Sequence, residues 1–148
     1  MKTALRGVLA VSAILCLPAL ALADKPKSIT FDNIKFEMKK EEPFKRSMIT
    51  EQIEALDSQS VVIRGWILPT SVFQLKGLKQ FIFVRDNQEC CFGPGAALYD
   101  SIQVEMDSGK SVDFTTRPIA VEGIFSIREF KLDGKIYSIY HLQAVKTK

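Results

Sequence analysis

The chain has 148 residues, 47% of them hydrophobic, a length that fits one domain with a modest core. Its formal net charge is +3, but Lys2 and Arg6 lie in the first six residues, and without them 18 basic residues face 17 acidic ones. A chain so close to neutral lacks the basic footprint of a nucleic-acid-binding protein, and we expect no nucleic-acid partner.

The N-terminus has the three parts of a secretory signal. Two basic residues precede an apolar run over residues 7–22, and the small residues Ala21 and Ala23 mark a cleavage site. The run is shorter than the roughly 20 residues that a membrane-spanning helix needs, and no second run follows, so we do not expect the chain to span a membrane. We expect export to the periplasm or the cell exterior, with residues 1–23 removed after Ala23 and Cys16 lost with them.

A polar, charged segment over residues 24–46 comes next. Its few apolar residues can attach it to the rest of the domain, and the main ones are Phe31, Ile34 and Phe36. A short helix is predicted over residues 48–56, with Ser47 as its N-cap. Three apolar residues fall on one face of that helix, and these are Ile49, Ile53 and Leu56.

From residue 61 onward the apolar residues alternate with polar ones, which is typical of strands. Five strands are predicted, over residues 61–68, 81–85, 101–106, 119–127 and 136–145. Gly65 and Gly123 lie inside long strands, where glycine often marks a bend or bulge. We therefore predict a mainly β fold over residues 47–148, a small five-stranded, partly open barrel of the oligonucleotide/oligosaccharide-binding (OB) type with a short N-terminal helix. A small β-sandwich is the alternative.

Several stretches in a fixed order resemble a family of exported bacterial proteins known only as a domain of unknown function. The stretches are Ile29–Glu37, Ile63–Pro69, Phe81–Val84 leading into Cys90, and Ile119–Gly123. The likeness covers most of the mature chain, and only Cys90 matches the family's loop residue by residue. Many members continue with a histidine and a proline run, whereas this chain has Phe92, so Cys-Cys-Phe-Gly-Pro-Gly marks a distinct subgroup. The resemblance implies no activity.

Cys90 and Cys91 are the most distinctive residues, because they are adjacent and are the only cysteines of the mature chain. A disulfide between them is one interpretation, although adjacent Cα atoms lie about 3.8 Å apart, below the usual disulfide range. A metal site is the second, because two thiolates favour Zn(II) or Cu(I). A disulfide between two chains and a pair of ordinary loop thiols are the others. The candidate metal ligands are Cys90, Cys91, Glu89, Asp100 and His141.

Two other side chains are candidates for a binding role. His141 is the only histidine of the chain, and a structural histidine is the alternative to a ligand. Trp66 lies in the first predicted strand, where it can serve as a stacking platform or pack in the core.

No nucleophile and base can be paired in the sequence, so we do not expect an enzyme. We predict an exported binding or accessory domain that takes a metal ion or a protein partner of the cell envelope at the Cys90–Cys91 loop. The alternative is a thiol-redox protein that uses a disulfide between the two cysteines.

Overall fold

The structure is a computed structural model, and it describes residues 25–39, 42–86, 97–132 and 134–148. The strands in this part of the chain are β1 (Lys27–Ile29), β2 (Ser60–Ile67), β3 (Gln80–Val84), β4 (Ser101–Met106), β5 (Ile119–Leu132) and β6 (Lys135–Thr147). The helical turns are η1 (Phe31–Ile34), η2 (Arg46–Met48), α1 (Glu51–Glu54), η3 (Pro69–Ser71) and η4 (Leu98–Asp100). The prediction of a mainly β fold is confirmed.

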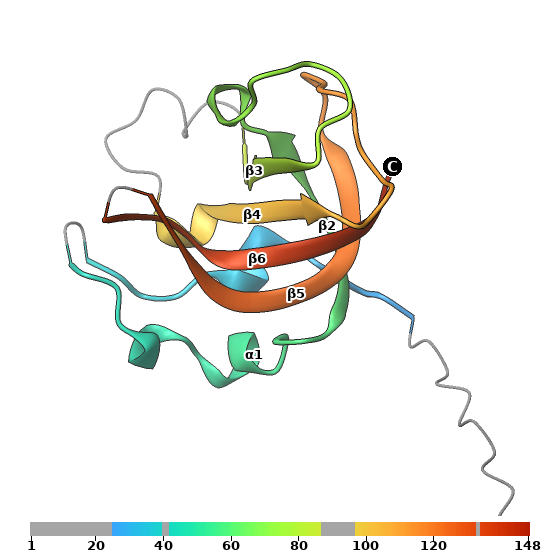
Figure 1. Cartoon of the computed structure of the whole chain (residues 1–148). Helices are drawn as coiled ribbons and strands as arrows, with labels where there is room; N and C mark the ends of the chain where they lie inside the picture. The colour runs from blue at the N-terminus through green and yellow to red at the C-terminus, as the bar shows by residue number, and fades with distance from the viewer. Residues whose placement is uncertain (1–24, 40–41, 87–96, 133) are drawn as a thin grey trace, which may run out of the picture.

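The strands form one six-stranded mixed sheet in the order β1-β2-β3-β4-β6-β5, and β2 also pairs with β5. The β1–β2 and β4–β6 pairs are parallel, and the other pairs are antiparallel. The sheet therefore curls back on itself, and Figure 1 shows β5 and β6 curving together around the other strands. The predicted count of five strands is wrong, because β1 comes from the polar segment before the helix.

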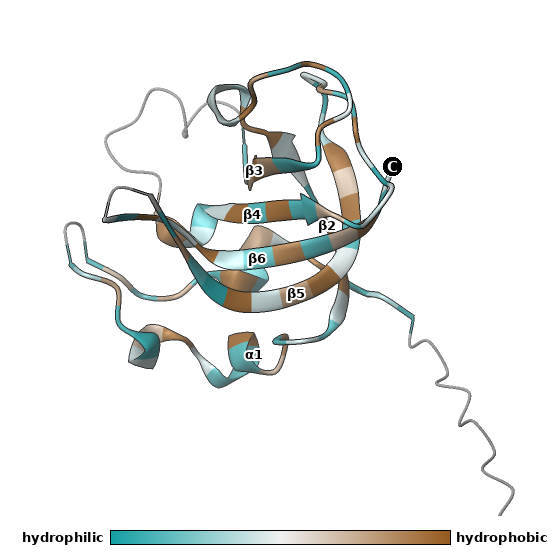
Figure 2. Cartoon of the chain, in the orientation of Figure 1, coloured by the Kyte–Doolittle hydropathy of each residue, from teal (hydrophilic) through white to brown (hydrophobic). Residues whose placement is uncertain are grey.

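The core lies inside the curled sheet, and the period-two pattern explains why. In β2, Val61, Ile63 and Ile67 are buried, while Arg64 between them is exposed. Figure 2 shows the same alternation of hydrophobic and hydrophilic residues along β5 and β6. Burial of one face of each strand thus fixes the register of the sheet.

The predicted helix is much shorter in the structure. α1 has one turn, Glu51–Glu54, and its N-cap is Thr50, whose side chain accepts a hydrogen bond from the Ile53 N–H at 3.4 Å. Ser47, the predicted cap, lies in η2. The helix gives way to a turn over residues 55–58, where Ser58 has a φ of +63° that a right-handed helix does not allow, and Ile53 and Leu56 already lie in the core.

The N-terminal segment is part of the same core. Phe31, Ile34 and Phe36 are buried, which confirms that they attach this segment to the sheet. Tyr140 of β6 donates a hydrogen bond from its hydroxyl to the carbonyl of Ile34 at 2.6 Å. Among the described residues, no helix is long and apolar enough to cross a membrane.

Candidate functional site

Of the residues predicted for a metal site, the structure describes Asp100 and His141. Cys90, Cys91 and Glu89 fall outside the described residues. Asp100 ends η4, and its Oδ1 lies 3.8 Å from Nη1 of Arg85. No group of three or more His, Cys, Asp or Glu side chains that could hold a metal ion occurs within the described ranges. The metal site at the cysteine loop therefore stays a prediction.

His141 lies in the middle of β6 and is only 5% exposed. Its Nδ1 is 3.5 Å from Oγ of Ser126 on β5, and its Nε2 is 3.5 Å from Oε2 of Glu105 on β4. Both distances are longer than the roughly 2.6–3.2 Å of a hydrogen bond that transfers a proton in catalysis. The presence of a serine, a histidine and a glutamate is therefore not in itself a sign of catalysis. The cluster joins three neighbouring strands across the outer face of the sheet.

The protonation of His141 is coupled to the stability of this face. Burial lowers the pKa of His141 below its ordinary value of 6.5, and the positive charge of Arg128 lowers it further. The nearby carboxylate of Glu105 opposes that shift. Because the pKa is lower in the folded chain, His141 takes up a proton more readily when the chain is unfolded.

We expect the free energy of unfolding to fall as the pH drops through 6.5, because the unfolded chain then binds more protons at His141 than the folded chain. Above that pH the ring is neutral in both states and contributes no such loss. His141→Gln removes this titration, so the variant should lose less stability than the parent between about pH 7.5 and about pH 5.5. Urea denaturation of both proteins at the two pH values measures the difference. An equal loss in both would contradict the assignment.

The outer face of the sheet carries two polar rows that cross four strands. The first row is Ile82, Gln103, His141 and Ser126, and the second is Gln80, Glu105, Gln143 and Ile124. The opposite side chains of the same strands form the core, so the face is held rigid by the packing beneath it. Amide, carboxylate and imidazole groups thus lie side by side on the outer face of a rigid sheet.

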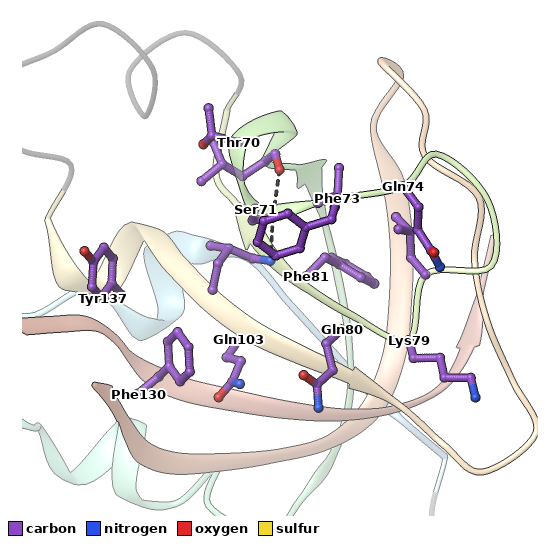
Figure 3. A pocket seen from close by; sticks show the side chains of 14 residues that line it. Thr70, Ser71, Phe73, Gln74, Lys79, Gln80, Phe81, Gln103, Phe130 and Tyr137 are labelled. Atoms are coloured by element: carbon purple, nitrogen blue, oxygen red, sulfur yellow. Dashed lines mark hydrogen bonds between the residues drawn. The ribbon is translucent and has the colours of Figure 1, made fainter. Parts of the chain in front are cut away.

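A groove of about 710 Å³ lies over the β3–β4 end of this face. Its wall is the segment that follows β2, its floor includes Gln80 and Gln103, and Phe130 and Tyr137 come from the two arms of the β5–β6 hairpin. Figure 3 shows Phe130 and Tyr137 at one end of the groove, Lys79 at the other end, and the two glutamines between them. The site is therefore built from segments that are far apart in the sequence.

The wall of the groove is fixed to its floor by hydrogen bonds. Oγ of Ser71 donates to the carbonyl of Leu68 at 2.7 Å and accepts from the N–H of Ile82 at 3.0 Å. The N–H of Leu68 donates to the carbonyl of Ile82 at 2.9 Å. The bonds between η3 and β3 hold the groove in a formed state, which lowers the cost of ordering it around a ligand.

Two side chains that face the groove have hydrogen-bonding groups that no described residue uses. The amides of Gln80 and Gln103 make no hydrogen bond with any described residue, whereas Gln74 donates to the carbonyl of Gly77 at 3.3 Å. Phe73 is fully exposed, and Tyr137 is 44% exposed. Exposed aromatic rings beside free amides can bind a ligand that has both apolar and hydrogen-bonding surfaces.

The family model described as "Protein of unknown function (DUF3299)" matches residues 19–148. The chain belongs to the DUF3299 family. This confirms the resemblance to a family known only as a domain of unknown function. No curated protein matches the chain.

Solved structures that resemble the chain include the following two. The crystal structure of a DUF3299 family protein (PA4066) from Pseudomonas aeruginosa PAO1 has a TM-score of 0.60 and 17% identity, over 83% of this chain and 95% of that one. This likeness shows a shared fold within the DUF3299 family. A putative aspartyl-tRNA synthetase from Leishmania major Friedlin has a TM-score of 0.42 and 15% identity, over 86% of this chain and 21% of that one, and so low a score supports no argument.

No sequence pattern predicts the groove of this DUF3299 member. The signal was present in part, because Phe73 lies in a loop where a large apolar residue has no strand or helix to bury it. Trp66, a predicted platform, is half-buried on the side of β2 opposite to Ile63 and Ile67, and it does not line the groove. The aromatic candidates for stacking are therefore Phe73 and Tyr137 instead.

Proposed function

We propose that this chain is an exported, non-enzymatic binding domain whose ligand lies in the groove over β3 and β4. The observation that carries the proposal is the pair of glutamine amides that no other described residue bonds to, set between exposed aromatic rings in a preformed groove. Aromatic rings exposed to water beside hydrogen-bonding side chains in a concave site are typical of ligand-binding surfaces. A ligand that covers them would use both.

The fold is a second reason to propose that the ligand binds in this groove. We propose that the ring of pairings among β2, β3, β4, β6 and β5 is a variant of the OB barrel, with β1 added to the edge of β2. OB barrels bind ligands on the face of their second and third strands, between the loop after the first strand and the loop after the fourth. Here those strands are β3 and β4, and the groove lies between the corresponding two connections. This support is an analogy at the level of the fold.

Export rests on the N-terminal signal, and it agrees with a binding role outside the cytoplasm. We propose that the mature chain begins at Asp24 after cleavage behind Ala23. Sequencing of the N-terminus of the protein recovered from the periplasm or the medium tests this. An intact Met1 on cytosolic protein would exclude it.

Binding in the groove is tested by screening the purified mature chain against arrays of immobilised glycans and of peptides. We expect at least one array member to bind, and we expect Phe73→Ala and Tyr137→Ala each to weaken that binding about tenfold, the loss of roughly 1.4 kcal/mol. Phe73 is fully exposed, so its removal should leave the melting temperature unchanged.

The matched control is Leu75→Ala, because Leu75 is also exposed in the same loop but does not line the groove. We expect this variant to bind like the parent chain. The proposal is wrong if no array member binds, or if Phe73→Ala and Leu75→Ala behave alike.

The roles of Cys90 and Cys91 stay predictions. As a thiol-redox protein the mature chain would show no free thiol until mild reduction releases two. As a Zn or Cu site it would carry metal after purification from its native compartment. Thiol counting before and after reduction, together with a metal analysis, separates these two functions from each other and from ordinary loop thiols.

A further inference from the structure

We infer that the ligand of the groove is a neutral oligosaccharide. The inference rests on the proposed function and adds the chemical class of the ligand. It follows from three properties of the groove: hydrogen-bonding groups that no other described residue engages, exposed rings, and little charge.

The two free amides require a ligand that can form hydrogen bonds. Gln80 and Gln103 each offer two donors and an acceptor, and no described residue uses them. A sugar hydroxyl is also both donor and acceptor, so it can satisfy either end of an amide. A lipid acyl chain over the same floor would bury both amides without partners, which is unfavourable. The groove therefore selects a polyhydroxylated ligand over a lipid tail.

The aromatic rings of the groove can pack against the apolar faces of a sugar. A pyranose ring carries hydroxyls around its edge and C–H groups on its faces, so one residue can pack on an aromatic ring while its edge reaches an amide. Phe73, Phe130 and Tyr137 stand around the glutamines, as Figure 3 shows. The rings of Phe130 and Tyr137 lie 6.4 Å apart with their planes at 55°, which gives the ligand two differently inclined surfaces.

The low charge of the groove disfavours a nucleic acid. Lys79 is the one charged side chain that lines the groove in the described part of the chain, and Lys135 adds a second cation, 5.5 Å from the centre of the Tyr137 ring. Binding of a nucleic acid draws most of its free energy from several cations that neutralise phosphates. Glu105 lies next to Gln80 across the β3–β4 pair and further repels phosphates. A neutral oligosaccharide needs no cations to neutralise it and is not repelled by Glu105.

An extended peptide is disfavoured by the pairing of the strands. Peptides often bind by adding a strand to the free edge of a sheet. The groove lies over the face of β3 and β4, which pair with each other from Gln80 and Glu105 to Val84 and Ser101. At Ile82, the backbone edge that faces η3 is bonded to Leu68 and Ser71. Of β3, only Gln80 keeps backbone groups on that edge without a bond to another described residue, and one residue is too short an edge for strand addition.

The experiment is calorimetric titration of the mature chain with linear neutral hexasaccharides of glucose, of N-acetylglucosamine and of mannose. We expect at least one to bind, and we expect Gln80→Ala, Gln103→Ala and Phe73→Ala each to weaken binding about tenfold. Gln143→Ala is the matched control, because Gln143 is also an outward glutamine of the second polar row but does not line the groove. It should bind within about twofold of the parent chain.

The possible outcomes distinguish a failure of the oligosaccharide inference from a failure of the proposed function. If a peptide or a single-stranded oligonucleotide binds instead, and Phe73→Ala weakens it, the groove is a binding site and the oligosaccharide inference is wrong. If no sugar, peptide or oligonucleotide binds, both are wrong. If a sugar binds but Gln143→Ala weakens it as much as Gln103→Ala, the groove is not where it binds, and the inference is also overturned.

Discussion

We expect Gly123→Ala to lower the free energy of unfolding by about 3 kcal/mol. A Cβ added at Gly123 would lie against the backbone carbonyl of Gln143 and the Cα of Ala144, on the neighbouring strand β6. These are backbone atoms, which cannot rotate away as the end of a side chain can. β5 and β6 would have to separate at this point, next to the register shift between Glu122 and Gly123.

Urea denaturation measures this effect, and Gly109→Asn is the control. Gly109 lies in a turn with φ of +76°, and nothing stands within 4 Å of an added Cβ. Asparagine tolerates the left-handed conformation better than other residues, so this change should cost less than about 1 kcal/mol. If both variants lose the same stability, close contact between the strands is not the reason for glycine at position 123.

The five strands from β2 to β6 could be predicted because each is encoded in local sequence. The alternation of buried and exposed residues in β2 and β4 follows directly from the order of apolar and polar side chains. β1 could not be found in this way. It has three residues, one of them buried, and it exists only because β2 offers a free edge beside Val61 and Ile63. A parallel strand so short carries no pattern of its own.

The candidate site could not be predicted for a related reason. Gln80 and Gln103 are ordinary outward residues of strands, and they become neighbours of Phe130 and Tyr137 only through the register of four strands. No motif joins positions that are so far apart in the chain. The cysteine pair is conspicuous in the sequence because it is local, but local prominence is not evidence that the two thiols face a ligand.

We expect Ile34→Ala to cost about 3 kcal/mol, as large as a truncation in the centre of a core. Ile34 is fully buried although it belongs to the polar segment before the helix. Its carbonyl accepts the hydroxyl of Tyr140 at 2.6 Å, and burial raises the pKa of Tyr140 so that the phenol remains a proton donor. The segment is thus bound to the sheet by both its side chain and its backbone.

Ile124→Ala is the matched control, because the same atoms are removed from a side chain that is 43% exposed on the outer face. It should cost less than about 1 kcal/mol. Tyr140→Phe should cost about 1–2 kcal/mol, because it leaves the buried carbonyl of Ile34 without its donor. Chemical denaturation of the three variants decides the question. If Ile34→Ala costs no more than Ile124→Ala, the N-terminal segment lies on the domain without stabilising it, and the sheet with its groove folds independently of β1 and η1.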